Sequence, residues 1–423
     1  MRGVLSHLKQ HGAKWLAVLV FSIPAVCGWP DRNDNTSENR NLAPFPAKPH
    51  DWAGIKQYPA QLDLWVNDHL GLRSQLVKLN SQLRYQLLRQ LPTQQAIIGK
   101  HGRLFLVTHN AAEMTYPAVA LPCGYQSGPH DPDAHRQAVV KQLNLFGQSM
   151  DQHRIAARLL IAPSSPMVHN DDLPDWLQQL CARQAPSVEQ AFAATDSASP
   201  ATPAAGSSAT QQAGKPVLSP IARSASFYPL QAMREAKATQ SVYPPGWFHW
   251  GGNGARLAAW LSVEHFWQVD ATRSLPLATV NERQPSDIGH LFPGVQLDSM
   301  VEMIDFARSG VSRCVGPGCF PELPLLDTLW GSARYRNPQA WPGRLVLLTD
   351  SFGLNIAPWY ARYFQDVMQV STNDIARLSP AERAQMRQLL LPEGPGHFAL
   401  FIYHDGAIFA NRIETDLKLL GLE

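Results

Sequence analysis

The chain has 423 residues, of which 45% are hydrophobic and 17% are charged, so it is long enough for one large domain or two ordinary ones with a buried core. The 36 Lys and Arg residues nearly balance the 34 Asp and Glu residues, and the net charge is only +2. No basic stripe with interleaved aromatic residues accompanies this balance, which gives no support to nucleic-acid binding.

The first 28 residues have the pattern of an export signal. Arg2, Lys9 and Lys14 precede an apolar run at 15–27, and small residues stand near its end. The run is shorter than the roughly 20 apolar residues that a membrane span needs. We therefore expect residues 1–28 to be a signal peptide or an uncleaved signal anchor, which places the protein in the periplasm, with inner-membrane attachment if the anchor is kept.

The cysteines beyond this leader are even in number. They are Cys123, Cys181, Cys314 and Cys319, and an even set in an exported chain favours disulfides. A bond between Cys314 and Cys319 would close a tight loop and leave Cys123 to pair with Cys181, although three pairings exist in principle. No His lies at ligand spacing beside the close pair, so we expect no metal.

Residues 29–95 are predicted to form an extended and helical lead-in. The stretch 31–48 is polar and rich in Pro, and leucines then recur at helical spacing between 55 and 90, with Gly71 separating two helices. Residues 96–106 have the pattern of two short strands around a Lys-His-Gly turn. We place the boundary of the main domain, 96–423, at the first of these strands.

The main domain alternates helices with continuously apolar strands. Helices are predicted at 134–154, 255–267 and 354–364, and strands at 157–163, 344–348 and 398–403. This alternation is typical of a parallel sheet covered on both faces, so we predict an α/β fold, a three-layer α/β/α sandwich with a mainly parallel sheet. The segment 184–226 consists mostly of Ala, Ser, Pro, Thr and Gln without a hydrophobic period, and we predict a flexible low-complexity insert there.

Ser351 occupies the most distinctive position in the chain. It lies in Thr-Asp-Ser-Phe-Gly at 349–353, between a buried strand and a helix, and therefore at the carboxyl edge of the predicted sheet, where such folds place their sites. Backbone N–H groups at the start of the helix, those of Ser351 and Phe352, can stabilise an oxyanion. The residues favour a nucleophile and a simple helix cap equally.

A serine nucleophile needs a base, and His249 is the best candidate. It lies between aromatic residues in a glycine-rich turn that opens the helix at 255–267. The other histidines considered, His290, His397 and His404, have no comparable setting, and we predict surface or packing roles for them. Asp350 is expected to fix the turn by accepting backbone N–H bonds.

Several segments, in chain order, resemble the alginate O-acetyltransferase family (AlgX/AlgJ) of SGNH-hydrolase-like proteins. They are Glu-Asn-Arg-Asn-Leu-Ala-Pro-Phe-Pro at 38–46, Asn-Asp-His-Leu-Gly-Leu-Arg at 67–73, Gly-Lys-His-Gly-Arg-Leu-Phe at 99–105, His-Trp-Gly-Gly-Asn-Gly-Ala at 249–255, Ser-Asp-Ile at 286–288 and Asp-Ser-Phe at 350–352. The resemblance implies an SGNH-hydrolase-like fold in which Ser351 is the nucleophile and His249 the base.

The family's triad has an Asp two residues before its His, where this chain has Trp247. Asp350, Asp287 and Asp405 are therefore candidates for a third member or for support of the turn, and a slow Ser-His dyad without a third member stays open. Trp247 and Trp250 are candidates for sugar contact, and for Trp250 a packing role beside His249 is equally favoured. An Asp in this role holds the His tautomer, and its loss can lower the rate by about 10⁴-fold.

By resemblance, the expected function is extracytoplasmic O-acetylation of an exopolysaccharide such as alginate through a serine acyl-enzyme. The expected partners are the polysaccharide and a membrane-bound acetyl donor or transporter protein, without a cofactor. Two alternatives stay open: a non-catalytic polysaccharide-binding scaffold in a modification or secretion complex, which Trp247 favours, and an acetyl esterase, which would use the same residues.

Overall fold

A computed structural model describes residues 43–69, 73–108, 117–124, 133–183, 185–193, 216–269 and 276–423. The chain divides into two compact units, one formed by Met1–Ala96 with Asp287–Leu297 and the other by Ile97–Ser286 with Asp298–Glu423. The predicted leader at 1–28 lies outside the described residues. Within the described part of the chain, no helix is long and apolar enough to cross a membrane.

The first unit contains the two predicted lead-in helices. They are α2 (Trp52–His69) and α3 (Arg73–Leu88), and the short helix η5 (Gly289–Leu291) belongs to the same unit. The end of α2 is fixed to the chain that precedes the helix, because Ala43 donates its N–H to Asp68 Oδ2 at 2.7 Å. Gln82 of α3 donates to the Gly294 carbonyl at 2.8 Å, which joins α3 to 287–297.

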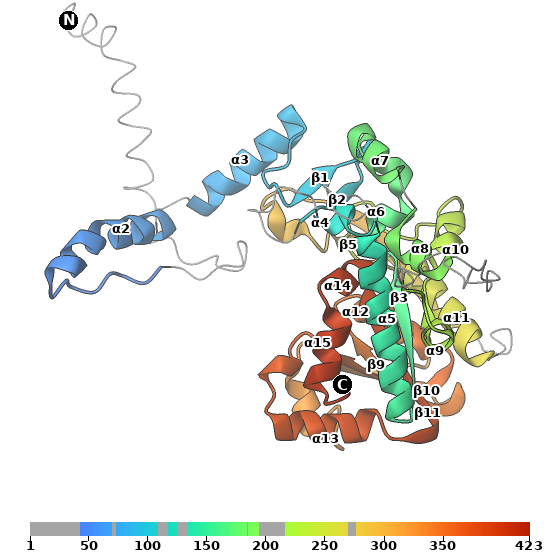
Figure 1. The fold of residues 1–423 in the computed structure, drawn as a ribbon. Coiled ribbons are helices and arrows are strands. Elements are labelled where there is room, and N and C mark those ends of the chain that lie inside the picture. The colour runs from blue at the N-terminus through green and yellow to red at the C-terminus, as the bar shows by residue number, and fades with distance from the viewer. Residues whose placement is uncertain are drawn as a thin grey trace, which may run out of the picture. The chain divides into compact units, whose positions relative to one another are not determined.

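The second unit is built on a seven-stranded, mostly parallel sheet (Figure 1). Its strands, in spatial order, are β4 (Ser226–Phe227), β3 (Ile155–Ala162), β11 (Gly394–His404), β9 (Trp341–Thr349), β10 (Phe364–Ser371), β8 (Ala333–Arg336) and β7 (Ser312–Cys314). The first five run parallel, and β8 and β7 add an antiparallel edge. The predicted α/β class with a mainly parallel sheet is therefore confirmed.

Alternate residues of the central strands enter one hydrophobic core. Leu159 of β3, Leu348 of β9 and Phe401 of β11 belong to it. The helices that contribute side chains to this core are α5 (Ala134–Gln152), α8 (Ser187–Ala193), α9 (Pro220–Ala225), α13 (Pro380–Leu390), α14 (Asp405–Phe409) and α15 (Arg412–Leu419). The residues in between along the strands, such as Leu347 and Ile402, are also fully buried. They point to the opposite face of the sheet, because side chains alternate along a strand. The helices α11 (Asn253–Trp267) and α12 (Gly353–Tyr360) contact strands of the same sheet and each other.

The remaining elements of the described chain are short. Two-stranded sheets are formed by β1 (Ala96–Ile98) with β2 (Leu104–Leu106) and by β5 (Thr279–Pro285) with β6 (Asp298–Ile304). The short helices are η2 (Lys100–Gly102), α4 (Pro117–Ala120), α6 (Ser165–Val168), η3 (Asn170–Asp172), α7 (Asp175–Cys181), α10 (Leu230–Ala236), η6 (Pro324–Thr328) and η7 (Ile375–Arg377).

The structure differs from the sequence prediction within 184–226. The helices α8 and α9 both fall inside this segment, and their small side chains Ala191 and Ala222 are fully buried. Helix α9 approaches α5 so closely that a Cβ on Gly147 would lie 2.8 Å from the backbone of Ala222. Alanines therefore suffice to bury these helices despite their weak hydrophobic pattern. Residues 194–215 lie outside the described residues, and their flexibility stays a prediction.

The helix predicted at 354–364 is shorter than expected. Helix α12 ends at Tyr360, and Phe364 begins β10, where it pairs with Trp341 of β9. Residues 361–364 continue the helical pattern in sequence, but Phe364, the last of them, belongs to the sheet. Pairing between strands is a tertiary interaction that a local pattern does not contain.

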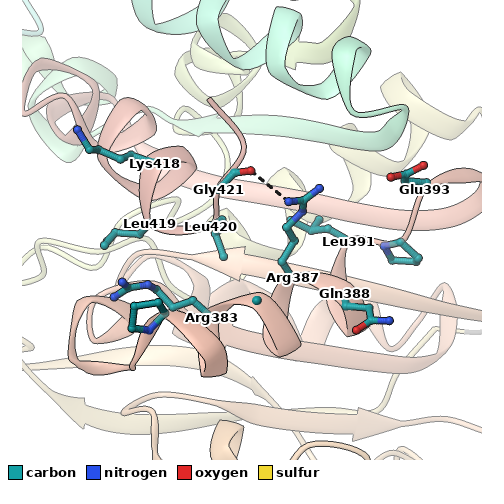
Figure 2. A pocket seen from close by; sticks show the side chains of 12 residues that line it. Arg383, Arg387, Gln388, Leu391, Glu393, Lys418, Leu419, Leu420 and Gly421 are labelled. Atoms are coloured by element: carbon teal, nitrogen blue, oxygen red, sulfur yellow. Dashed lines mark hydrogen bonds between the residues drawn. The ribbon is translucent and has the colours of Figure 1, made fainter.

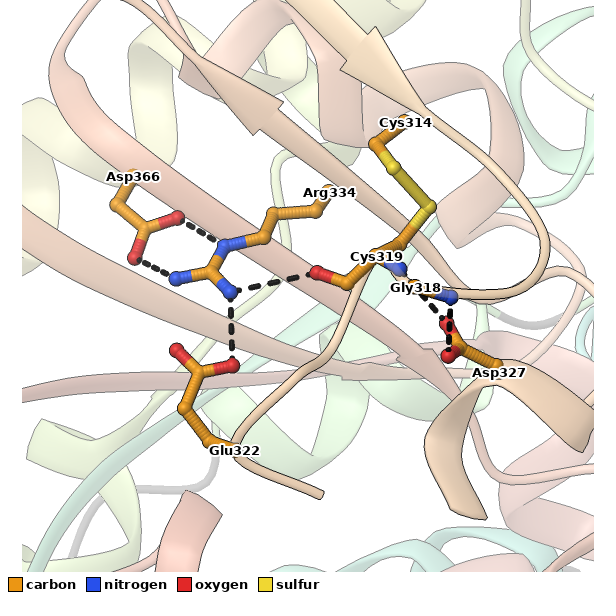
Figure 3. Close-up of a disulfide and its surroundings, with 7 residues drawn as sticks. All are labelled: Cys314, Gly318, Cys319, Glu322, Asp327, Arg334 and Asp366. Carbon is orange, nitrogen blue, oxygen red and sulfur yellow. Dashed lines mark hydrogen bonds and ion pairs between the residues drawn. A yellow bond between two sulfur atoms is a disulfide. The ribbon is translucent and has the colours of Figure 1, made fainter. Parts of the chain in front are cut away.

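Two disulfides are present, and they join the predicted pairs. Cys123 and Cys181 have Cα atoms 5.2 Å apart, and those of Cys314 and Cys319 are 5.5 Å apart. Figure 3 shows how the second loop is held: Arg334 of β8 forms two 2.7 Å hydrogen bonds with Asp366 and reaches the Cys319 carbonyl at 3.3 Å. Asp327 accepts the N–H groups of Gly318 and Cys319. The loop at 314–319 is thus fixed from both sides.

Candidate active site

The site centres on Ser351 and His249, which the fold brings together although they are 102 residues apart in sequence. Strand β9 ends at Thr349 and α12 begins at Gly353, so Ser351 occupies the turn at the carboxyl edge of the sheet. His249 Nε2 lies 2.8 Å from Ser351 Oγ, within hydrogen-bond distance for proton transfer. Both residues are half-buried, which leaves the pair accessible to a substrate.

Two close approaches of the backbone set the positions of these residues. A Cβ on Gly353 would lie only 2.0 Å from Thr349 Oγ1, so glycine is required where α12 packs onto the end of β9. A Cβ on Gly254 would lie 1.9 Å from the Val242 carbonyl oxygen, which explains a glycine in the first turn of α11. Both glycines flank the reacting pair, and a larger residue at either position would displace one member of it.

Trp250 fastens the turn of His249 to the turn of Ser351. Its Nε1 donates to the Phe352 carbonyl at 2.9 Å, and Asn355 Nδ2 donates to the Trp250 carbonyl at 3.0 Å. The Trp250 side chain is fully buried. Of the two roles open to Trp250, the structure favours packing beside His249 over sugar contact, because a side chain without exposed surface cannot stack on a substrate. Trp247, in contrast, lines a pocket of about 280 Å³.

Asp350 has the expected role of fixing the nucleophile turn. Its Oδ1 accepts the Phe352 N–H at 2.9 Å, and its Oδ2 accepts two bonds from His404, from the backbone N–H at 2.9 Å and from Nδ1 at 2.7 Å. Burial alone would raise the pKa of Asp350, but the charge of His404 and these hydrogen bonds outweigh it and lower that pKa. Asp350 is thus committed to the turn and is not the partner of His249.

The role of His404 was not predicted correctly from sequence. Burial alone would lower its pKa, but the charge of Asp350 and the hydrogen bond to it prevail and raise that pKa. His404 also stacks on Phe352, with ring centroids 5.1 Å apart. One signal was present in the sequence: His404 ends β11, the neighbour of β9, and ends of adjacent parallel strands meet at one edge of the sheet.

Asp405 is likewise engaged elsewhere. Its Oδ2 accepts bonds from the N–H and Oγ of Ser164 at 2.9 and 3.2 Å and from the Tyr228 hydroxyl at 3.1 Å. Its buried Oδ1 has no hydrogen-bond partner among the described residues. Burial raises the pKa of this carboxyl despite those hydrogen bonds. Asp405 is therefore not the third member of a triad with His249. The role of Asp287 stays a prediction from the sequence.

One of the two predicted oxyanion donors, the Phe352 N–H, is already used within the nucleophile turn. The Phe352 N–H already donates to Asp350 Oδ1, a charged acceptor within the turn. A donor held by a carboxylate is poorly placed to stabilise a second anion. The N–H of Ser351 stays the predicted donor for a developing oxyanion.

The residues described in the structure offer no metal centre, because no three or more His, Cys, Asp or Glu side chains among them are arranged to hold an ion. A separate cavity of about 720 Å³ lies at the opposite edge of the sheet. Figure 2 shows Arg383 and Arg387 of α13 facing the end of α15 in this cavity, where Arg387 donates to the Gly421 carbonyl at 3.1 Å. The cavity adjoins the amino end of β11, roughly 30 Å along the strand from its carboxyl end.

No protein-family model matches the sequence, and the comparison with curated proteins gives no match. Among solved structures, the chain is similar to a DHHW family protein from Eubacterium siraeum, with a TM-score of 0.42 and 10% identity over 77% of this chain and 98% of that one. It is also similar to the O-acetyltransferase domain of Pseudomonas putida AlgJ (TM-score 0.38, 13% identity, 78% and 99% covered). The same holds for Pseudomonas aeruginosa AlgX (0.39, 12%, 77% and 67%). AlgX and AlgJ give their names to the family that the sequence motifs resemble.

Proposed function

We propose that this protein is an extracytoplasmic O-acetyltransferase of the SGNH-hydrolase type that modifies an exopolysaccharide through an acyl-enzyme on Ser351. The observation that carries the proposal is the 2.8 Å contact between Ser351 Oγ and His249 Nε2 at the carboxyl edge of the sheet. A helix cap alone would not need a histidine at this distance. The ordered motifs at 249–255 and 350–352 support the acetyltransferase class.

The chemistry follows from the positions of the two side chains. His249 Nε2 takes the proton of Ser351 Oγ as this oxygen attacks the acyl carbonyl of the donor. The Ser351 N–H stabilises the oxyanion that forms. The intermediate collapses when the donor's leaving oxygen takes the proton from His249. In the second half, His249 deprotonates a sugar hydroxyl, which attacks the acyl-serine and releases Ser351 with its proton restored.

The setting of the reaction outside the cytoplasm is supported by the two disulfides, because such bonds persist in oxidising compartments. The acetyl donor would be supplied by a membrane-bound partner, and no step of this scheme needs a cofactor. We propose a three-layer α/β/α sandwich for the catalytic unit, with α11 and α12 opposite the helices of the main hydrophobic core.

Acetylation of Ser351 tests the proposal. The purified chain should hydrolyse 4-nitrophenyl acetate slowly and gain one acetyl group on Ser351, as mass spectrometry of its peptides would show. Ser351→Ala should abolish both results, and His249→Gln should slow acylation by roughly 10²- to 10⁴-fold. Absence of turnover and of an adduct in the wild-type chain would sink the enzyme proposal and leave the polysaccharide-binding scaffold as the alternative.

Two further arms refine the assignment. Asp287→Asn should slow acylation by up to about 10⁴-fold if Asp287 orients His249, whereas the matched variant Asp298→Asn should leave the rate unchanged. Adding a polysaccharide acceptor separates transfer from hydrolysis. A transferase gives acetyl esters on the polymer, whereas an esterase gives only free acetate.

A further inference from the structure

The cavity of about 720 Å³ lies between α13 and the end of α15, and all of its lining residues belong to the second unit. One face of α13, with the residue after it, forms one wall: Pro380, Arg383, Ala384, Arg387, Gln388 and Leu391. The other wall contains residues 418–421 at the end of α15. Since a helix rises about 1.5 Å per residue, the α13 wall is about 16 Å long, which is the length of roughly five residues of extended chain.

The lining of this cavity carries more positive than negative charge. Arg383 and Arg387 stand one helical turn apart on α13, and Lys418 belongs to the opposite wall (Figure 2). Among the described residues, Glu393 is the only carboxylate in the lining, and it lies just beyond the end of α13. The α13 wall is therefore positive along the helix and negative after its last residue.

Both guanidinium groups are held in place without being neutralised. Arg383 Nη1 donates to the Leu378 carbonyl at 2.8 Å, and Arg387 Nη1 donates to the Gly421 carbonyl at 3.1 Å. In the part of the chain that the structure describes, neither guanidinium forms an ion pair with a carboxylate. Each arginine thus keeps most of its N–H donors for an acidic group. Both side chains are half-buried, so solvent screens their charge less than on an open surface.

The rest of the lining limits the kind of ligand. Among the described residues, no aromatic ring lines the cavity, so neither a sugar ring nor a nucleobase has a surface on which to stack. Ala384, Pro392 and Leu419 instead offer apolar surface that is exposed or half-buried. A lipid surface is uniformly anionic and would bring its charge against Glu393. A short peptide with carboxylates and an apolar side chain matches both the charges and the apolar surface.

We propose that this cavity is a docking site for an acidic segment of a partner protein. Carboxylates one turn apart on a helix, or two residues apart in an extended chain, are separated by about 5–7 Å, which matches the spacing of Arg383 and Arg387. Each arginine would form charge-assisted hydrogen bonds with one carboxylate, and Lys418 would attract a third. The cavity and Ser351 lie at opposite edges of the sheet, so a docked partner leaves the reaction centre open. The inference therefore does not depend on the proposed function.

Fluorescence anisotropy of the full chain with labelled synthetic peptides tests the inference. The probe is the peptide Gly-Glu-Leu-Glu-Glu-Leu-Glu-Gly, and its neutral counterpart has Gln in place of every Glu. We expect the acidic peptide to bind at about 20 mM salt, and the neutral peptide to bind about tenfold or more weakly, because the arginines lack an anionic partner in it. Arg383→Gln and Arg387→Gln should each weaken binding of the acidic peptide roughly two- to fivefold. The matched variant Arg308→Gln removes an exposed arginine outside the lining and should bind like the wild type.

Two further variants separate direct contact from a loss of folding. Glu393→Gln removes a carboxylate that repels the acidic peptide, so it should strengthen binding about twofold. The double variant Arg383→Glu with Arg387→Glu should lose the acidic peptide and bind a third peptide, in which Lys replaces every Glu. A reversed preference for charge cannot arise from unfolding.

Three results would overturn the inference: equal binding of the acidic and neutral peptides, wild-type binding in both single arginine variants, or no binding of the Lys peptide by the double variant. A uronate oligosaccharide that binds more tightly than the acidic peptide would also overturn it and assign the cavity to an anionic polymer. Binding is measured without an acetyl donor, so a chain that acetylates Ser351 but does not bind the acidic peptide would refute the docking site alone.

Discussion

Replacing His404 with Gln tests the buried pair that supports the nucleophile turn. Gln can still donate a hydrogen bond to Asp350 Oδ2, but it cannot carry the positive charge of His404. The native contact is 2.7 Å long, and the two side chains are only 17% and 7% exposed, so solvent screens it weakly. Hydrogen bonds to charged groups contribute about 1.5–3 kcal/mol to stability, so His404→Gln should lower the free energy of unfolding by an amount in this range where both groups are ionised.

The loss of stability caused by His404→Gln should be larger at acidic pH than at alkaline pH. The pKa of His404 is raised from 6.5, so its contribution is complete below pH 6.5 and disappears as the pH rises through the folded value. The pKa of Asp350 is lowered from 3.8, so its contribution is complete above pH 3.8 and disappears as the pH falls through the folded value. The destabilisation by His404→Gln should therefore be largest between pH 3.8 and 6.5 and should shrink at alkaline pH.

Thermal unfolding of the full chain at pH 5 and pH 9 measures this effect. At about 2 °C per kcal/mol for a unit of this size, the melting temperature should fall by roughly 3–6 °C at pH 5 and by clearly less at pH 9. His397→Gln, an exposed histidine on the same strand, is the matched control and should change neither value. An equal decrease for His404→Gln at both pH values would refute the charged pair and leave only packing of its ring on Phe352.

The remaining predictions concern the turn and the disulfides. Gly353→Ala places a Cβ 2.0 Å from Thr349 Oγ1, so we expect the free energy of unfolding to fall by about 1–3 kcal/mol or more and Ser351 to be acylated more slowly. Thermal melting and 4-nitrophenyl acetate turnover measure the two effects. A wild-type melting temperature together with a wild-type turnover rate would contradict the close packing. Replacing both cysteines of the 314–319 bond with Ser should lower the free energy of unfolding by roughly 2 kcal/mol, and the same change at the 123–181 bond should lower it by roughly 4 kcal/mol. The difference arises because a disulfide that closes a longer loop restricts the unfolded chain more, and the sequence separations are 5 and 58. Denaturant unfolding of the two double variants measures this order.

Local patterns in the sequence predicted much of the second unit. Continuous apolar runs identified β3, β9 and β11, because strands covered on both faces have no polar side to alternate. The same reasoning placed Ser351 between a strand and a helix, and the glycine-rich turn singled out His249. Local patterns also explain why α8 and α9 were not predicted. These helices are buried through small alanines, whose hydrophobic signal in the sequence is weak.

The reaction centre could be predicted in part for a physical reason. Parallel strands place their carboxyl ends at one edge, so residues that follow such strands meet there regardless of their separation in sequence. This rule covers Ser351 after β9 and would have covered His404 at the end of β11, which pairs with Asp350 from 54 residues away. It does not state which atoms bond, and so the sequence left Asp350 and Asp405 open as partners of His249.

Periodicity, spacing and residue type were enough to predict the class of the fold and the disulfide candidates and to single out Ser351 and His249. The surroundings of these two residues depend on tertiary packing. Trp247 and Trp250 are three residues apart, yet one lines a pocket and the other is fully buried against the nucleophile turn. Burial and hydrogen-bond partners arise from the packing of distant segments, and no local pattern contains that information.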